Sequence, residues 1–289
     1  MTFGGEGGVI EIVDLDGDQA LDLLVTSGDS DELVVLRNPS NAFGDGTFAM
    51  SAVDVGQFPF GVVAAEFDEF EGPDVAVSNG ESNDLWVFPT MQDGELGNPM
   101  VYPSGGVEPG FVRAADMNGD GRLDLLTSNH SSAQATVLLN NGPGFDSADA
   151  YSVGSGPSSP TPFDLDGDGD LDLMTANEED ETMSVLLNDG SGALSDAGTI
   201  DPGGIPFYIE PLDFDGDGDL DMAVPIEDQA RVAFFANDGG NFTEVASTDV
   251  GSSPASMGSG DFDGDGDLDL VVTNFFSDTV SILLAQPPE

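Results

Sequence analysis

The chain has 289 residues, enough for one large domain or two ordinary ones, and 39% of them are hydrophobic, so a buried core is possible. Its formal net charge is −52, with four arginines and no lysine. Such a surface repels polyanions, which argues against nucleic acid and anionic membranes as partners. There is no cysteine for a disulfide, and no run of about 20 apolar residues that would mark a membrane span.

An acidic nine-residue motif recurs along the chain. Its copies begin at Asp14, Glu66, Asp116, Asp164, Asp213 and Asp261. Successive copies are 52, 50, 48, 49 and 48 residues apart. A period near 50 residues predicts a repeat architecture with six units. We call the six copies the first to sixth loops, at residues 14–22, 66–74, 116–124, 164–172, 213–221 and 261–269.

Each repeat has the same parts in the same order. An apolar segment such as 8–13 leads into the loop, and an alternating segment such as 123–127 follows it. A polar turn such as 177–181, a third apolar segment and an Asn-Asp-Gly-type turn such as 188–190 come next, before a weaker fourth segment. Four short strands per repeat without helical periodicity are typical of a propeller blade. The sequence therefore predicts an all-β fold, a β-propeller of six four-stranded blades, in which residues 1–289 form a single domain.

The last repeat is short. Only 28 residues follow Asp261, whereas the fourth strand of the fourth repeat is expected at 193–200. We therefore expect the last blade to lack its outer strand. A seven-bladed propeller with one blade missing from this chain is the alternative.

The fourth loop reads D-L-D-G-D-G-D-L-D and has the chemistry of a calcium site. One oxygen each from Asp164, Asp166 and Asp168, the backbone carbonyl of Asp170 and both oxygens of Asp172 would supply six ligands. With a water the number is seven, within the roughly 6–8 that Ca²⁺ takes. Glycine at position 6 suits the sharp turn because it tolerates positive φ.

Three other interpretations compete with this one. An EF-hand requires an acidic ligand at position 12, where the five best loops carry valine or threonine. The nonapeptide repeats of β-helices run back to back, and these copies do not. A merely solvated acidic turn would leave closely spaced carboxylates repelling one another. The recurrence of the pattern therefore favours calcium.

The D-x-D-G-D-G-x-x-D loop, the following L-D-L-V/M-T-x-N strand and the N-D-G turn resemble the FG-GAP/VCBS repeat proteins, a group that includes the propeller of integrin α subunits. The resemblance covers essentially the whole chain. It implies these side-chain ligands: Asp14, Asp16, Asp18, Asp22, Asp116, Asn118, Asp120, Asp124, Asp164, Asp166, Asp168, Asp172, Asp213, Asp215, Asp217, Asp221, Asp261, Asp263, Asp265 and Asp269. It implies backbone carbonyl ligands from Ala20, Arg122, Asp170, Asp219 and Asp267.

Two loops depart from the motif. Phe70 stands at position 5 of the second loop, where a ligand is required, so we expect weak calcium binding there or none. Gln19 stands at position 6 of the first loop in place of glycine. A left-handed glutamine costs roughly 1 kcal/mol, so we expect that site to be weaker and still to form.

In a four-stranded blade the loops and the Asn-Asp-Gly turns share one face. The resemblance to integrins implies that partners dock on the opposite face. Candidates there are Phe58, Phe60, His130, Phe207, Tyr208, Phe275 and Phe276, with Glu178, Glu179 and Asp180 nearby. The alternative is that these aromatic residues only pack between blades. His130 is the sole histidine, and nothing in the sequence marks a catalytic partner for it.

The sequence favours a non-enzymatic, calcium-stabilised binding or adhesion module that is secreted or held at the cell surface, where calcium is abundant. Its partner would be a protein or a carbohydrate, and the chain a monomer or part of a longer protein. A lectin-like propeller and a polysaccharide-acting enzyme domain are the alternatives. Residues 1–13 show no signal peptide, so a secretion signal is expected outside this chain. A salt-rich habitat is a second explanation for the charge.

Overall fold

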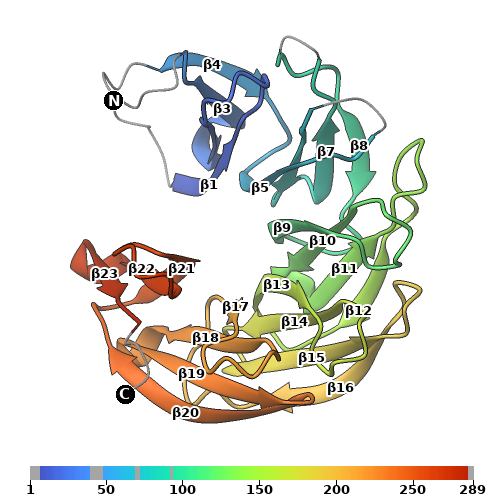
Figure 1. Cartoon of the computed structure of the whole chain (residues 1–289). Coiled ribbons are helices and arrows are strands. Elements are labelled where there is room, and N and C mark those ends of the chain that lie inside the picture. The colour runs from blue at the N-terminus through green and yellow to red at the C-terminus, as the bar shows by residue number, and fades with distance from the viewer. Residues whose placement is uncertain (1–6, 40–47, 69–71, 92–93, 286–289) are drawn as a thin grey trace. The chain divides into compact units, whose positions relative to one another are not determined.

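The computed structural model of the chain describes residues 7–39, 48–68, 72–91 and 94–285. In these residues it is all-β, with 23 strands in six antiparallel sheets and four three-residue 3-10 helices. Each sheet pairs its strands in chain order, which is the meander of a propeller blade (Figure 1). Over the described ranges, no helix combines the length and the apolar character that crossing a membrane requires.

The chain divides into two compact units, and the first comprises residues 1–151. It contains three four-stranded sheets. The first sheet has β1 (Gly7–Val13), β2 (Asp22–Ser27), β3 (Glu32–Arg37) and β4 (Ala49–Asp54). The second has β5 (Pro59–Ala65), β6 (Asp74–Asn79), β7 (Asp84–Phe88) and β8 (Met100–Pro103). The third has β9 (Pro109–Ala115), β10 (Asp124–Asn129), β11 (Gln134–Leu138) and β12 (Asp149–Ser152).

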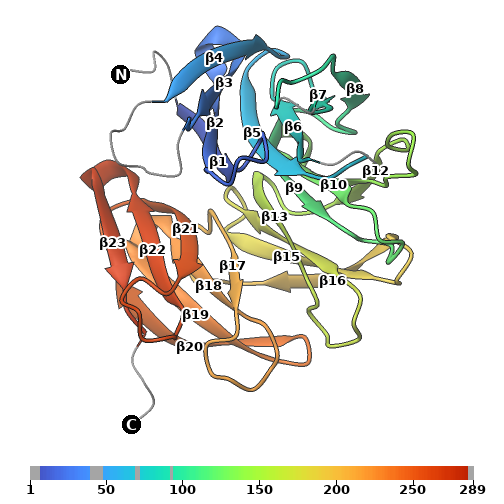
Figure 2. The ribbon, with the colours of Figure 1, turned by 45° about the horizontal axis from the view of Figure 1, so that its top comes forward.

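The second unit comprises residues 152–289. Its first sheet has β13 (Pro157–Phe163), β14 (Asp172–Asn177), β15 (Thr182–Asn188) and β16 (Leu194–Ile200). Its second has β17 (Glu210–Leu212), β18 (Asp221–Ile226), β19 (Arg231–Asp238) and β20 (Asn241–Asp249). Its last sheet has only β21 (Pro254–Gly260), β22 (Asp269–Asn274) and β23 (Thr279–Leu283), as Figure 2 shows in a second view.

The predicted fold class is confirmed, including the three-stranded last blade. The four 3-10 helices, η1 (Gly28–Ser30), η2 (His130–Ser132), η3 (Glu227–Gln229) and η4 (Phe275–Ser277), each connect the second and third strands of a sheet. The single-domain assignment stays a prediction.

Each acidic loop connects the first two strands of its sheet. The residue before the loop pairs with the residue at position 9, as Phe163 does with Asp172 in the fourth sheet and Val13 with Asp22 in the first. The motif is therefore a hairpin connection whose first and last carboxylates are brought together by strand pairing. This confirms the expectation that the loop joins two strands.

Apolar side chains at loop positions 2 and 10 pack between neighbouring sheets in several repeats. Leu15 and Val75 share one core cluster, and Leu165 and Met222 share another. All four are at most 2% exposed, so these positions anchor their loops to the core. Phe214 and Phe262, at position 2 of the fifth and sixth loops, are exceptions, with 36% and 52% of their surface exposed.

Candidate metal centres and the opposite face

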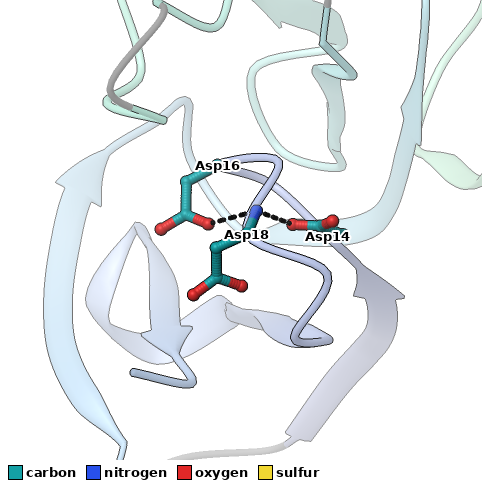
Figure 3. Close-up of side chains that lie close together, drawn as sticks. All are labelled: Asp14, Asp16 and Asp18. Atoms are coloured by element: carbon teal, nitrogen blue, oxygen red, sulfur yellow. Dashed lines mark hydrogen bonds between the residues drawn. The ribbon is translucent and has the colours of Figure 1, made fainter. Parts of the chain in front are cut away.

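Acidic side chains converge in four of the loops. Their carboxylate oxygens lie within 4.8 Å of one another in these groups: Asp14, Asp16 and Asp18; Asp164, Asp166 and Asp172; Asp213, Asp215 and Asp221; Asp261, Asp263 and Asp265. Figure 3 shows the first group, with Asp14, Asp16 and Asp18 around the backbone of one tight loop. Calcium binds oxygens at about 2.3–2.6 Å, so two oxygens on one ion are at most about 5 Å apart. The separation therefore fits calcium.

The loop backbone holds these carboxylates in place. In the fourth loop, the N–H of Gly169 donates to Asp164 Oδ2 at 3.1 Å, and the N–H of Asp168 donates to Asp166 Oδ1 at 3.2 Å. The N–H of Asp170 donates to Asp168 Oδ1 at 2.9 Å. The same three bonds recur in the first, third, fifth and sixth loops. Because an oxygen that accepts one N–H keeps a further lone pair, these bonds orient the carboxylates without excluding a cation.

Asn118 takes the place of aspartate at position 3 of the third loop. Its Oδ1 accepts a hydrogen bond from the N–H of Asp120 at 2.9 Å, as the aspartates do at this position. The amide oxygen thus points where a ligand is expected, although no group of three acidic side chains forms around it among the described residues. At position 5 of the second loop, Phe70 lies outside the described residues, and the weakness of that loop stays a prediction.

Two positions in each of these loops have left-handed backbone. At position 6 φ is +70° for Gln19 and +97° for Gly169, which bears out the strained glutamine. Position 4 is left-handed as well, with φ of +75° at Gly17 and +80° at Gly167, a requirement that the sequence analysis missed. The repeated glycine at position 4 was the available signal.

Replacing Gln19 with glycine should therefore stabilise the first sheet. Removing the left-handed strain returns roughly 1–2 kcal/mol, and the greater freedom of glycine in the unfolded chain offsets about 0.5–1 of it. We expect the free energy of unfolding to rise by about 0.5–1 kcal/mol in denaturant titration. Gln19→Ala is the matched control and should give no gain, and a gain equal to that of the glycine variant would contradict the strain.

The aspartate at position 9 has a structural role that the sequence analysis missed. In the fourth loop, Asp172 is 1% exposed and accepts the N–H of Leu165 on Oδ2 at 2.9 Å and the N–H of Asn188 on Oδ1 at 2.7 Å. It thereby clamps the start of the loop to the end of the third strand. We call this arrangement the position-9 clamp.

The position-9 clamp is present in all six repeats, including the degenerate second one. Asp74, which was not among the predicted site residues, is 3% exposed and accepts the N–H groups of Phe67 at 3.2 Å and Thr90 at 2.9 Å. The clamp recurs at Asp22, Asp124, Asp221 and Asp269. Retention of aspartate in a loop that has lost another ligand shows that the clamp does not require the full ligand set.

Burial affects the charge state of the clamping residues. Desolvation raises the pKa of Asp172, and backbone N–H bonds from Asn188 and Leu165 lower it in part. Burial likewise raises the pKa of Asp22, Asp74, Asp124 and Asp221. A cation beside such a group favours its ionised form, so the donor set suits a metal electrostatically. Binding through both oxygens of position 9 and the carbonyl of position 7 stays a prediction.

Two of the four arginines lie beside loops. Nη1 of Arg37 is 4.0 Å from Asp16 Oδ2, and Nη1 of Arg122 is 3.5 Å from Asp120 Oδ2. Arg37 also donates to the carbonyl of Gly94, in the connection between β7 and β8. A fixed positive charge next to a carboxylate opposes a bound cation, so the electrostatics favour a cation less in the first and third loops than in the loops of the second unit.

Two kinds of segment lie on the face opposite to the acidic loops. They are the connections from one sheet to the next and the turns between the second and third strands of each sheet. Phe58 donates its N–H to Asp31 and accepts the N–H of Gly80, both in or next to such turns. In the first unit this face has a pocket of about 490 Å³, lined by Phe58, Gly80, Glu81, Asn83, Val107 and Glu108. His130 lies beside it, with Nδ1 4.0 Å from Glu108 Oε2. Two residues predicted for this face, Phe58 and His130, therefore both lie close to Glu108.

The other predicted aromatic residues have two different environments. Phe60 is half-buried against Phe111, with ring centroids 5.2 Å apart, and Tyr208 packs against a core cluster. Phe207 is also half-buried. By contrast Phe275 and Phe276, in η4, are 72% and 73% exposed and lie 5.4 Å apart. The packing interpretation thus fits the former residues, whereas the Phe275 and Phe276 side chains are exposed to solvent.

The chain resembles solved propellers with diverse activities. It is similar to BBS1N in complex with ARL6DN (15% identity, TM-score 0.65, covering 91% of this chain and 74% of that one). It resembles a virginiamycin B lyase from Staphylococcus aureus solved with quinupristin (12% identity, TM-score 0.63, covering 98% of this chain and 82% of that one). A lectin from Agrocybe aegerita that recognises non-reducing terminal N-acetylglucosamine is also similar (19% identity, TM-score 0.55, covering 84% of this chain and 66% of that one). At these identities the likeness shows the fold alone.

The sequence comparisons identify the repeats. No curated protein matches the chain. A model of the FG-GAP-like repeat matches it three times, at residues 116–175, 164–224 and 213–272. These matches span residues 116–272, more than half of the chain, and each extends from one acidic loop into the next repeat. The chain belongs to the FG-GAP-like repeat family.

Proposed function

We propose that the chain is a calcium-stabilised binding module that works outside the cell and is not an enzyme. The observation that carries this proposal is the convergence of carboxylate oxygens within 4.8 Å in the loops of four repeats. Hard oxygen donors in this number and spacing suit Ca²⁺ better than softer metals. Calcium at extracellular concentration would keep such sites filled. An unchanged melting temperature in excess EDTA would contradict this part of the proposal.

The bound ions would act as structural links. Each would neutralise carboxylates that otherwise repel one another at the end of a hairpin, and would tie the first strand of a sheet to the second. The fourth, fifth and sixth loops would bind calcium most tightly, because the arginines that lie beside acidic loops are at the first and third loops. The overall charge of −52 adds to the need for cations.

The face opposite to the loops would bind a protein or a carbohydrate. At the turn between second and third strands, the sixth repeat carries Phe275 and Phe276, whereas the corresponding turns at 178–180 and 227–229 are polar. Exposed aromatic rings offer stacking surface for a sugar and anchors for a protein, and an exposed apolar patch of this kind marks an interaction site. The acidic surroundings would exclude polyanionic partners.

A double variant tests this surface. We expect Phe275→Ser/Phe276→Ser to reduce partner binding at least about tenfold, since interface aromatic residues carry a large share of binding energy. The melting temperature should stay unchanged because both rings are exposed. Binding is measured on a glycan array and by surface plasmon resonance with partners enriched from extracellular protein, both at millimolar calcium.

The half-buried Phe60 provides the matched control. Phe60→Ser should lower the melting temperature, because it removes packing against Phe111. A glycan array without signal would exclude a carbohydrate as the partner of this face. Equal partner binding by the double variant and the unaltered chain would contradict this surface.

A further inference from the structure

Asn237 connects two neighbouring acidic loops in the second unit. It lies near the end of β19, the third strand of its sheet, and is 5% exposed. Its Nδ2 donates to the carbonyl of Leu220, at position 8 of the fifth loop, at 3.1 Å. The same Nδ2 donates to the carbonyl of Leu165, at position 2 of the fourth loop, also at 3.1 Å. Both amide hydrogens are therefore used, one on each loop.

The remaining groups of Asn237 contact a candidate ligand of the fifth loop and a glycine that lies beside the fourth loop. Its backbone N–H donates to Asp221 Oδ1 at 2.8 Å, and Asp221 belongs to the carboxylate group of the fifth loop. Its Oδ1 accepts the N–H of Gly240 at 2.8 Å. A Cβ placed on Gly240 would lie 3.5 Å from the Cβ of Asp166, a ligand candidate of the fourth loop.

Leu165 is held from both sides by this network. Its N–H donates to Asp172 of its own loop at 2.9 Å, and its carbonyl accepts from Asn237 of the next sheet. A movement of Asp172 towards an ion would thus shift the peptide groups that Asn237 contacts. Because these groups are buried and fully hydrogen-bonded, the displacement cannot be absorbed by solvent.

The same arrangement also occurs in the first unit. Asn140 Nδ2 donates to Phe67 of the second loop at 2.8 Å and to Leu123 of the third at 3.2 Å, and its N–H donates to Asp124 at 2.7 Å. The second repeat has Thr90 at the corresponding position. The Oγ1 of Thr90 is buried without a hydrogen-bond partner, so threonine preserves the clamp but not the link to a neighbouring loop.

We propose that Asn237 couples the metal sites of the fourth and fifth loops, so that an ion in one loop raises the affinity of the other. The inference rests on the proposed calcium function. Asn237 acts as a positioning residue, since it contacts the carboxylate and backbone that hold ligands and contributes no ligand itself. The coupling would spread ion binding through adjacent sheets.

A site-resolved titration of the full chain tests the coupling. The amide protons of Gly169 and Gly218 donate to Asp164 and Asp213, so their NMR signals report on the fourth and fifth loops separately. Calcium is added to the metal-free chain, and the affinity of the fifth loop is measured with the fourth loop intact and with Asp168→Ala. The pair of measurements is repeated with Asn237→Ala.

With Asn237 present, loss of the fourth site should weaken the fifth at least about fivefold, the usual lower range of coupling between sites. In the Asn237→Ala background, loss of the fourth site should change the calcium affinity of the fifth loop less than about twofold. Asn237→Thr, the residue that the second repeat carries, serves as the second variant if alanine prevents folding. Asn140→Ala is the control, and it should leave the fivefold effect unchanged.

The outcomes separate the two proposals. If neither glycine signal moves at millimolar calcium, the proposed calcium function fails. If both signals move and the ratio is the same with and without Asn237, calcium binding stands and the coupling is overturned. A merely structural role for Asn237 would lower the melting temperature without changing this ratio.

Discussion

Removal of calcium should lower the melting temperature of the chain by about 20 °C. A site held at about 100 times its dissociation constant contributes about 2.7 kcal/mol, so several filled loops together contribute about 10 kcal/mol. For a chain of this size each kcal/mol corresponds to about 2–4 °C. Loss of the ions also restores repulsion within the carboxylate groups. The measurement is differential scanning calorimetry in millimolar calcium and in excess EDTA.

Two controls distinguish specific binding from general screening of the charge. Sodium chloride screens exposed carboxylates and should recover only part of the lost stability. Magnesium requires a tighter octahedral shell and dehydrates reluctantly, so it should recover less than calcium at equal concentration. Full recovery with sodium chloride alone would show that the loops are solvated acidic turns.

Asp172→Ala and Asp74→Ala should each destabilise the chain by about 3 kcal/mol in EDTA. In calcium the loss should stay the same for Asp74→Ala and be larger for Asp172→Ala, which also removes a ligand. Each change leaves two buried N–H groups without an acceptor, and a hydrogen bond to a charged group is worth about 1.5–3 kcal/mol. Asp74 tests the position-9 clamp in the repeat expected to bind calcium weakly or not at all. Denaturant titration of the two variants in EDTA and in calcium gives the four changes in the free energy of unfolding.

Asp168→Ala is the matched change at position 5. Its side chain accepts one exposed backbone N–H, from Asp170 at 2.9 Å. We expect a loss of about 2.7 kcal/mol in calcium and almost none in EDTA, because this residue contributes mainly through the ion. Equal losses for Asp168→Ala and Asp172→Ala in EDTA would contradict the separation of ligand and clamp.

Much of the fold follows from the sequence because its signals are local and repeated. The spacing of the loops, the alternating segments and the turn residues predict the six sheets, and the 28 residues after Asp261 predict the three-stranded last one. The fourth strands were harder to place because they are exposed and carry little apolar pattern. β20, for example, is exposed at eight of its nine positions.

The candidate site was predictable only in part. Loop spacing indicates which carboxylates converge, but not that Asp74 would be buried between two backbone N–H groups. That arrangement depends on Thr90, 16 residues away, at the end of another strand. Likewise the bond from Asn237 to Leu165 spans 72 residues, and no local pattern expresses it. The recurrence of asparagine at 38, 140, 188 and 237 was the available signal.

The second repeat shows what the position-9 clamp permits over evolutionary time. A repeat that has lost the ligand at position 5 but keeps its last aspartate still closes its hairpin, so mutations at other acidic positions are not immediately lethal to the fold. Individual loops can then drift away from ion dependence while their neighbours retain it. The calcium requirement of such a protein can therefore be adjusted gradually, one repeat at a time, as its environment changes.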